Sequence, residues 1–152
     1  MPRVTDNVTG RTPFIRADLN NRGFIRAIAT TGATLDYPYK LIWDDNGWRS
    51  VPIIASTSIK QFMVGFCSKT VTTNGVTDFQ IIGPITGLIT TVAQTSGYDL
   101  THTYNSALIE TTGAVYDGNA NQIAVARNTS TALSTSAQAY ITGQFRGWLA
   151  TT

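Results

Sequence analysis

The sequence predicts an all-β protein, with an antiparallel β-sandwich or barrel of hairpins as its architecture. The chain holds 25 threonines but only one glutamate and three lysines. Glutamate and lysine usually fill the solvent-facing positions of helices, whereas threonine suits a pleated, half-buried surface. Several runs alternate apolar and polar residues and end at turn-forming pairs, and no segment has a clear helical period.

The first residues differ in composition from the rest of the chain. Residues 1–12 are polar and contain Pro2 and Gly10, so we expect an extended N-terminal arm there rather than a strand. The hydrophobic fraction of the chain is 42%, which is enough for the remaining length to bury a core. We therefore expect residues 13–152 to form a single β domain.

Turn-forming residues divide the first half of this domain into three hairpins. The turns are Asn20-Asn21, Asp44-Asp45-Asn46-Gly47 and Asn74-Gly75. The strands that they join are expected at residues 14–17 and 23–30, 37–43 and 48–55, and 62–67 and 76–82. Pro38 suggests that the strand at 37–43 is an edge strand, because proline cannot donate to a β-ladder.

The third hairpin has the clearest pattern, and weaker strands follow it. Its second strand alternates Val76, Asp78, Gln80 and Ile82 with Thr77, Phe79 and Ile81, and this period of two indicates a strand with one buried face. We expect this strand to stop at Gly83-Pro84. Further strands are expected at residues 85–93, 101–110, 113–116, 122–127 and 137–149, with a turn at Asp117-Gly118-Asn119.

Residues 62–84 resemble part of a known protein family. An apolar strand with the small residue Gly65 leads into a threonine-rich turn, a glycine and the run Phe79-Gln80-Ile81. This order resembles the decoration (cement) proteins on the heads of tailed bacteriophages. The resemblance implies a homotrimeric virion protein, made in the host cytoplasm, that binds the outer surface of the assembled head. It also implies that the protein stabilises the head by bridging subunits of the major capsid protein.

The N-terminal end is basic. Arginine occurs five times in the first 26 residues, against two aspartates. Such an end suits an acidic partner surface, although an ordinary solvated terminus explains the same composition. This basic composition, together with the resemblance to decoration proteins, leads us to expect that the arm faces the capsid. Its candidate contacts are Arg3, Arg11 and Arg16.

Four aromatic residues form a second candidate site. Tyr37, Tyr39 and Trp43 share parity, so on one continuous strand they lie on one face, and Trp48 follows across the hairpin. Buried, this face is core. Exposed, it forms a protein interface or a platform for sugar rings. The last reading supports an alternative function, a receptor- or carbohydrate-binding β domain of a phage tail or fibre.

The sequence contains no clear catalytic or metal-binding motif. His102 and Cys67 are the single histidine and the single cysteine, and neither lies in a nucleophile motif or completes a zinc site. The oxygen-rich turns could supply calcium ligands, but their composition is explained by turn formation. We therefore expect no enzyme, no cofactor and no metal.

Nucleic acids and membranes are not expected partners either. The net charge is only +2, and no run approaches the roughly 18 apolar residues that span a bilayer.

Overall fold

The computed structural model describes residues 15–44, 47–52, 63–90, 92–102, 108–110, 122–133 and 135–142. All regular elements in these ranges are strands, so the all-β prediction is confirmed. They are β1 (Ile15–Ala17), β2 (Gly23–Ala29), β3 (Pro38–Asp44), β4 (Gly47–Pro52), β5 (Met63–Cys67), β6 (Gly75–Leu88), β7 (Asp99–His102), β8 (Leu108–Glu110), β9 (Gln122–Ala126) and β10 (Ala137–Ile141). The predicted arm at residues 1–12 lies outside the described residues.

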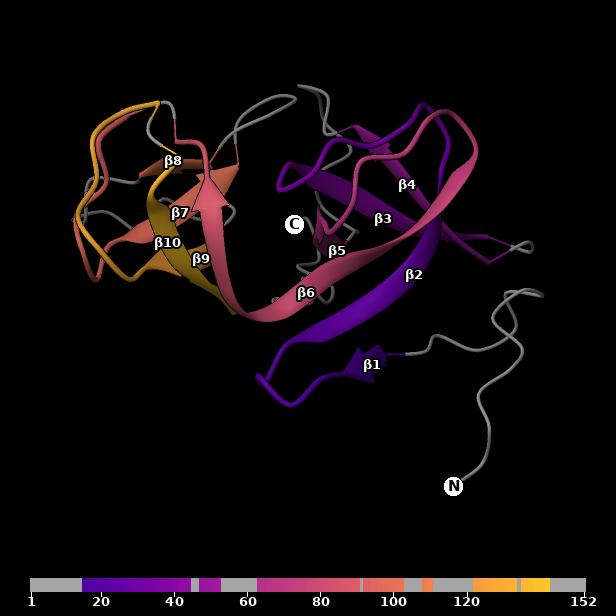
Figure 1. Cartoon of the computed structure of the whole chain (residues 1–152), viewed down its shortest axis with the longest axis horizontal. Coiled ribbons are helices and arrows are strands. Elements are labelled where there is room, and N and C mark those ends of the chain that lie inside the picture. The colour runs from indigo at the N-terminus through magenta and orange to yellow at the C-terminus, as the bar shows by residue number, and fades with distance from the viewer. Residues whose placement is uncertain are drawn as a thin grey trace, which may run out of the picture.

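Five strands close into a barrel in the order β2-β4-β3-β5-β6, with β6 paired back to β2 (Figure 1). Four of the five pairings are antiparallel, and β2 and β4 are parallel. Strand directions cannot alternate all the way round a ring with an odd number of members, so one pairing must be parallel. The predicted barrel is therefore present, but it is mixed, and the prediction of purely antiparallel pairing is wrong at β2–β4.

The second half of the chain adds another sheet, in the order β6-β10-β9-β7-β8. The N-terminal half of β6 belongs to the barrel, and its C-terminal half pairs with β10 at Gly83 to Leu88. The prediction that this strand stops at Gly83-Pro84 is wrong, because Gly83 adopts a φ of 101° and bends the strand from one sheet into the other. In Figure 1 the long ribbon of β6 runs from the barrel to the second sheet.

The buried side chains form two clusters, one for each sheet. The barrel interior is narrow, as expected for so few strands, and it accommodates small residues such as Ala27 and Gly65. A Cβ atom at Gly65 would lie 2.7 Å from Leu41 Cδ1 and 2.8 Å from Phe79 Cβ, so no larger residue fits there. The second cluster combines the inner face of the second sheet with Phe66, which comes from the barrel strand β5.

The three hairpins predicted from the turns are all present, as the pairs β1–β2, β3–β4 and β5–β6. Pro38 does not mark an edge strand, since β3 lies between β4 and β5. It is instead the first residue of its strand, a position where a missing N–H group is tolerated.

The later strands were predicted less well. Residues 101–110 do not form one strand, because β7 and β8 pair as a hairpin in which Thr101 lies opposite Ile109. The strand expected at 85–93 is the end of β6 and stops at Leu88. The strands expected near 122–127 and 137–149 are present as β9 and β10, and residues 113–116 and 143–149 lie outside the described ranges.

Candidate interaction site

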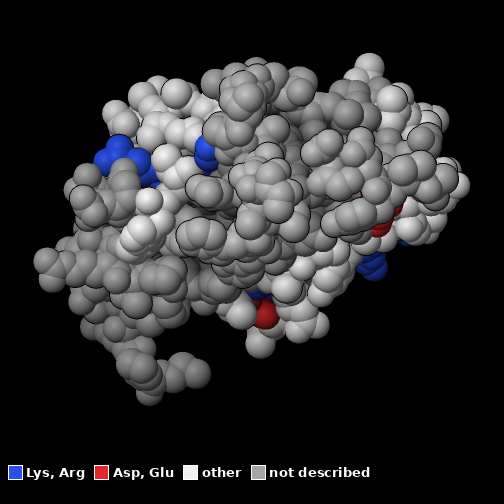
Figure 2. All heavy atoms as spheres, turned by 180° about the vertical axis from the view of Figure 1, so that it is seen from behind, with Lys and Arg blue, Asp and Glu red and all other residues white. Residues whose placement is uncertain are grey.

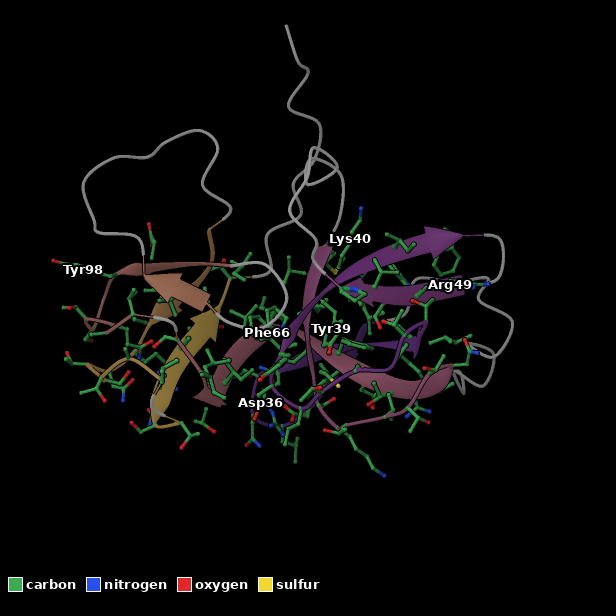
Figure 3. The ribbon with its side chains drawn as sticks, turned by 90° about the horizontal axis from the view of Figure 1, so that it is seen from above. Asp36, Tyr39, Lys40, Arg49, Phe66 and Tyr98 are labelled. Atoms are coloured by element: carbon green, nitrogen blue, oxygen red, sulfur yellow. The ribbon has the colours of Figure 1, made fainter. Side chains whose placement is uncertain are left out.

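A groove of about 910 Å³ lies between the outer face of the barrel and the second sheet. Its walls come from β2, β5 and β6, from Leu35 and Asp36 before β3, and from Ser68 and Lys69 after β5. Figure 3 shows Phe66 and Asp36 in the middle of the molecule, between the two sheets. The groove therefore lies at the junction of the two halves of the fold.

The floor of the groove contains a buried glutamine. Gln80 has the parity of the exposed residues of β6, yet it is only 5% exposed. Its side-chain Nε2 donates to the backbone carbonyls of Ile82, at 3.3 Å, and Pro84, at 2.8 Å. These two bonds hold the glutamine side chain against the backbone on both sides of Gly83, where β6 bends.

Two arginines on the β2 side of the groove are already paired. Arg26 Nε donates to Asp78 Oδ1 at 3.0 Å, and this bond raises the pKa of the arginine. Arg22 forms an ion pair of 2.6 Å with Asp18 and lies over the ring of Phe24 at 5.4 Å. The hydrogen bond from Arg22 lowers the pKa of Asp18. These four charges stabilise each other locally.

Asp36 is different, because its carboxylate has no hydrogen bond or ion pair with any described residue. The backbone is held in the left-handed region, with a φ of 63°, and its N–H donates to the carbonyl of Cys67 at 2.8 Å. The side chain lies against Gly87, where an added Cβ would come within 3.2 Å of Oδ2. Burial raises the pKa of Asp36. An unpaired, half-buried carboxylate on a strained residue is costly, which makes it a candidate functional group.

The raised pKa of Asp36 predicts how stability depends on pH. From the ordinary value of 3.8 up to the raised value, the folded state binds more protons than the unfolded state, so stability falls as pH rises. Asp36→Asn is expected to remove this loss and to unfold at a higher urea concentration than the wild type at neutral pH. Asp18→Asn is the matched control, because the pKa of Asp18 is lowered and its contribution is lost as pH falls. A wild-type and an Asp36→Asn protein with the same pH profile would contradict this prediction.

Cys67 is a poor nucleophile in this environment. It is 1% exposed, and its Sγ donates to the backbone carbonyl of Lys69 at 3.0 Å. Desolvation raises the pKa of the thiol, and the charge of Asp36 raises it further. The reactive thiolate is therefore disfavoured at neutral pH. The side chain of His102 lies outside the described part.

The four aromatic residues do not share one exposed face. Tyr39 is core: its ring packs edge-on against Phe79 at 5.8 Å, and its hydroxyl accepts a bond of 2.9 Å from the N–H of Thr34. Tyr37 and Trp48 are half-buried and pack against the same cluster. Trp43 is 42% exposed and meets Trp48 in a T-shaped contact at 5.3 Å. Of this candidate set, Trp43 offers the most exposed ring.

The candidate capsid contacts are mostly outside the described residues. Arg3 and Arg11 belong to the arm, and Arg16 lies on β1 opposite Phe24, with its side chain not described. Figure 2 shows one face of the molecule, on which the Lys and Arg residues of the described part occupy a few separate positions. The described part of the chain holds no cluster of His, Cys, Asp or Glu that could bind a metal, and it contains no helix that could span a membrane.

Sequence reasoning missed Asp36 and the groove. Asp36 precedes Tyr37 and Pro38, where an aspartate is fully explained as a turn residue. The feature that distinguishes it is the approach of Gly87 from the second sheet, which depends on the bend at Gly83. That bend was read as the end of a strand, so no signal in the sequence placed the two segments together.

The fold resembles that of a solved phage protein, described as the N base of the head fiber gp8.5 of bacteriophage phi29. The two structures superpose with a TM-score of 0.56 at 13% sequence identity. The match covers 80% of this chain and 95% of that chain. At this identity the likeness shows a shared fold. No protein-family model matches the chain, and no curated protein sequence matches it.

Proposed function

We propose that this chain is a structural protein of a phage head, which binds the outer surface of the assembled shell and stabilises it. The observation that carries the proposal is the fold shared with the head-fiber base, which extends over 80% of this chain. The pattern at residues 62–84, which resembles head decoration proteins, is a separate observation from the fold and supports the same kind of virion protein. A charge-poor chain, with 13% charged residues against about 25% in ordinary soluble domains, suits a protein packed against neighbours.

The proposed mechanism is a bridge between major capsid subunits. A protein that binds only the assembled shell stabilises that state by mass action, by about 2.7 kcal/mol per site when its free concentration is 100 times Kd. We assign the capsid contact to the N-terminal arm, with Arg3, Arg11 and Arg16 as the contacting side chains. An arm that becomes ordered on binding can reach two subunits, although ordering costs conformational entropy.

The role is proposed as non-enzymatic and without a cofactor. In the groove, the unreactive state of Cys67 supports this assignment. We further propose that the protein acts as a homotrimer, because a threefold assembly can contact several shell subunits at once. Light scattering is expected to give a mass about three times that of the 16.4 kDa chain.

Deleting residues 1–12 is expected to abolish binding to phage heads while the β domain stays folded. The physical reason is that this segment carries Arg3 and Arg11, whereas the first described strand, β1, begins at Ile15. Co-sedimentation with assembled heads measures binding, and circular dichroism with light scattering measures fold and mass. A truncated protein that still pellets with heads would refute the assignment of the arm.

A control separates loss of charge from loss of length. Replacing Arg3 and Arg11 together with glutamine keeps the arm and removes two charges, and we expect binding that is weaker and less sensitive to salt. If the full chain does not co-sediment with phage heads but binds sugars on a glycan array, the proposal is replaced by the alternative function, a receptor- or carbohydrate-binding domain.

A further inference from the structure

The turn that leads into β6 contains an Asn-Gly pair, the sequence in which an asparagine side chain is most reactive. The N–H of Gly75 donates to the carbonyl of Thr72 at 2.8 Å and closes a four-residue turn. Asn74 is the third residue of this turn, has a φ of 61°, as in a type II turn, and is exposed to solvent. Asparagine is chemically labile, and a following glycine does not shield its amide because it lacks a Cβ atom. Asn74 is therefore a candidate site of chemical modification.

The fold requires this pair in spite of its reactivity. A Cβ atom at position 75 would lie 2.8 Å from the carbonyl oxygen of Thr72 and 2.8 Å from the Cβ of Val71, so only glycine fits there. At position 74 the left-handed conformation favours asparagine, aspartate or glycine. The turn thus retains a reactive sequence for steric reasons.

The reaction open to this pair is loss of the Asn74 amide. The backbone nitrogen of Gly75 loses its proton and attacks Cγ of Asn74, which forms a C–N bond and a five-membered succinimide. The bond between Cγ and the side-chain nitrogen breaks, and this nitrogen takes up a proton and leaves as ammonia. Water then opens the ring and yields aspartate or isoaspartate, without any oxidant or reductant.

The folded turn opposes the first step in two ways. The proton that must leave Gly75 is shared with the carbonyl of Thr72, so its removal breaks the hydrogen bond that closes the turn. The N–H of Asn74 donates to the carbonyl of Ala29 at 2.7 Å, and Ala29 is fully buried in the barrel core. Attack on Cγ needs the peptide nitrogen and the side chain to rotate toward each other, and these two bonds restrict that rotation.

We propose that Asn74 is a deamidation site that the folded turn protects and that reacts when the turn opens. Conversion to aspartate leaves the backbone unchanged, and aspartate accepts the same φ. Isoaspartate instead inserts a methylene group into the backbone before Gly75. Gly75 pairs with Ala29 in the β2–β6 pairing that closes the barrel, so the extra length disrupts the end of this closure. This inference goes beyond the proposed binding to heads and does not depend on it.

The test compares the folded and the unfolded full-length protein in the same buffer at mildly alkaline pH. One sample contains enough guanidinium chloride to unfold the chain, and peptide mapping by mass spectrometry follows the conversion of Asn74. We expect conversion to be at least about tenfold slower in the folded protein, because its rate scales with the population of the open turn. The control is the peptide acetyl-Thr-Thr-Asn-Gly-Val-Thr-amide, which should react at the same rate with and without the denaturant.

Asn74→Asp is the matched variant for the consequence of the reaction, because it carries the new charge without the extra methylene group. The isoaspartate protein with Asn46 intact, isolated from the denatured sample and refolded, is expected to unfold at a lower urea concentration than Asn74→Asp. Equal rates of conversion in the folded and unfolded protein, or no conversion in either, would overturn the proposal. Equal urea midpoints of the isoaspartate protein and Asn74→Asp would also overturn it, because the turn would then tolerate the longer backbone.

Discussion

Replacing Phe66 with alanine is expected to lower the free energy of unfolding by about 3–5 kcal/mol. Phe66 is fully buried, and it is the barrel residue that enters the core of the second sheet. Its removal leaves a cavity at the junction, because backbone pairing fixes the surrounding strands. The loss is expected to fall mainly on the second sheet, whose core depends on this ring, while the barrel retains its own cluster around Phe79.

Amide hydrogen exchange distinguishes the two halves. In Phe66→Ala, protection should fall most at β9 and β10 and least at β2 and β3. Phe79→Ala is the matched control, because Phe79 is also fully buried but belongs to the barrel cluster, so its loss should reduce protection in the barrel first. Equal loss of protection in both halves of Phe66→Ala would show that the junction does not depend on this side chain.

Gly83→Ala is expected to destabilise the fold by at least about 3 kcal/mol, since backbone strain and a steric clash add together. The φ of 101° is unfavourable for any residue with a side chain. The added Cβ would also lie 2.4 Å from the backbone oxygen of Asn21 and 3.0 Å from Arg22 Cα, and neither atom can move without shifting the β1–β2 turn. Urea unfolding measures the loss as a lower midpoint.

Gly97→Ala provides the comparison for Gly83→Ala. Gly97 also has a positive φ, of 87°, but an added Cβ there would meet no atom within 4 Å. Only the backbone strain remains, and the expected cost is about 1 kcal/mol. A loss of equal size in the two variants would mean that contact with Asn21 does not constrain the bend of β6.

The sequence predicted those parts of the fold that local chemistry determines. The turns at Asn20-Asn21 and Asn74-Gly75 correctly placed hairpins, because these residues adopt the positive φ angles that tight turns need, and Asn21 and Asn74 both do. Period-two alternation correctly indicated that the strand after Asn74-Gly75 has one buried face, which in the structure is the face of Thr77, Phe79 and Ile81. These signals act over a few residues, so a single sequence is enough to read them.

The features that were missed depend on contacts between distant segments. The parallel pairing of β2 with β4 follows from closing a ring of five strands, which no local pattern specifies. A glycine followed by a proline is expected both where a strand ends and where a strand bends. At Gly83 the strand bends, and this depends on the close approach of Asn21, which is distant in the sequence.

The candidate sites also depend on contacts that the local sequence does not specify. Sequence parity grouped Tyr39 with Trp43, but burial differs along β3, so Tyr39 is core and Trp43 is exposed. Asp36 had no distinguishing signal, because its position in the groove depends on β6 crossing from the barrel to the second sheet.

The edge of β6 in the second sheet also bears on how many copies can be crowded together. If copies of this protein lie side by side on a shell, an open strand edge would invite pairing from one copy to the next and lead to fibrous aggregation. Five strands form the closed ring of the barrel. In the second sheet, the edge of β6 is obstructed because Pro84 has no N–H group and its carbonyl already accepts a hydrogen bond from Gln80. Neighbouring copies can thus reach high local concentration with little tendency to propagate a continuous sheet through this edge.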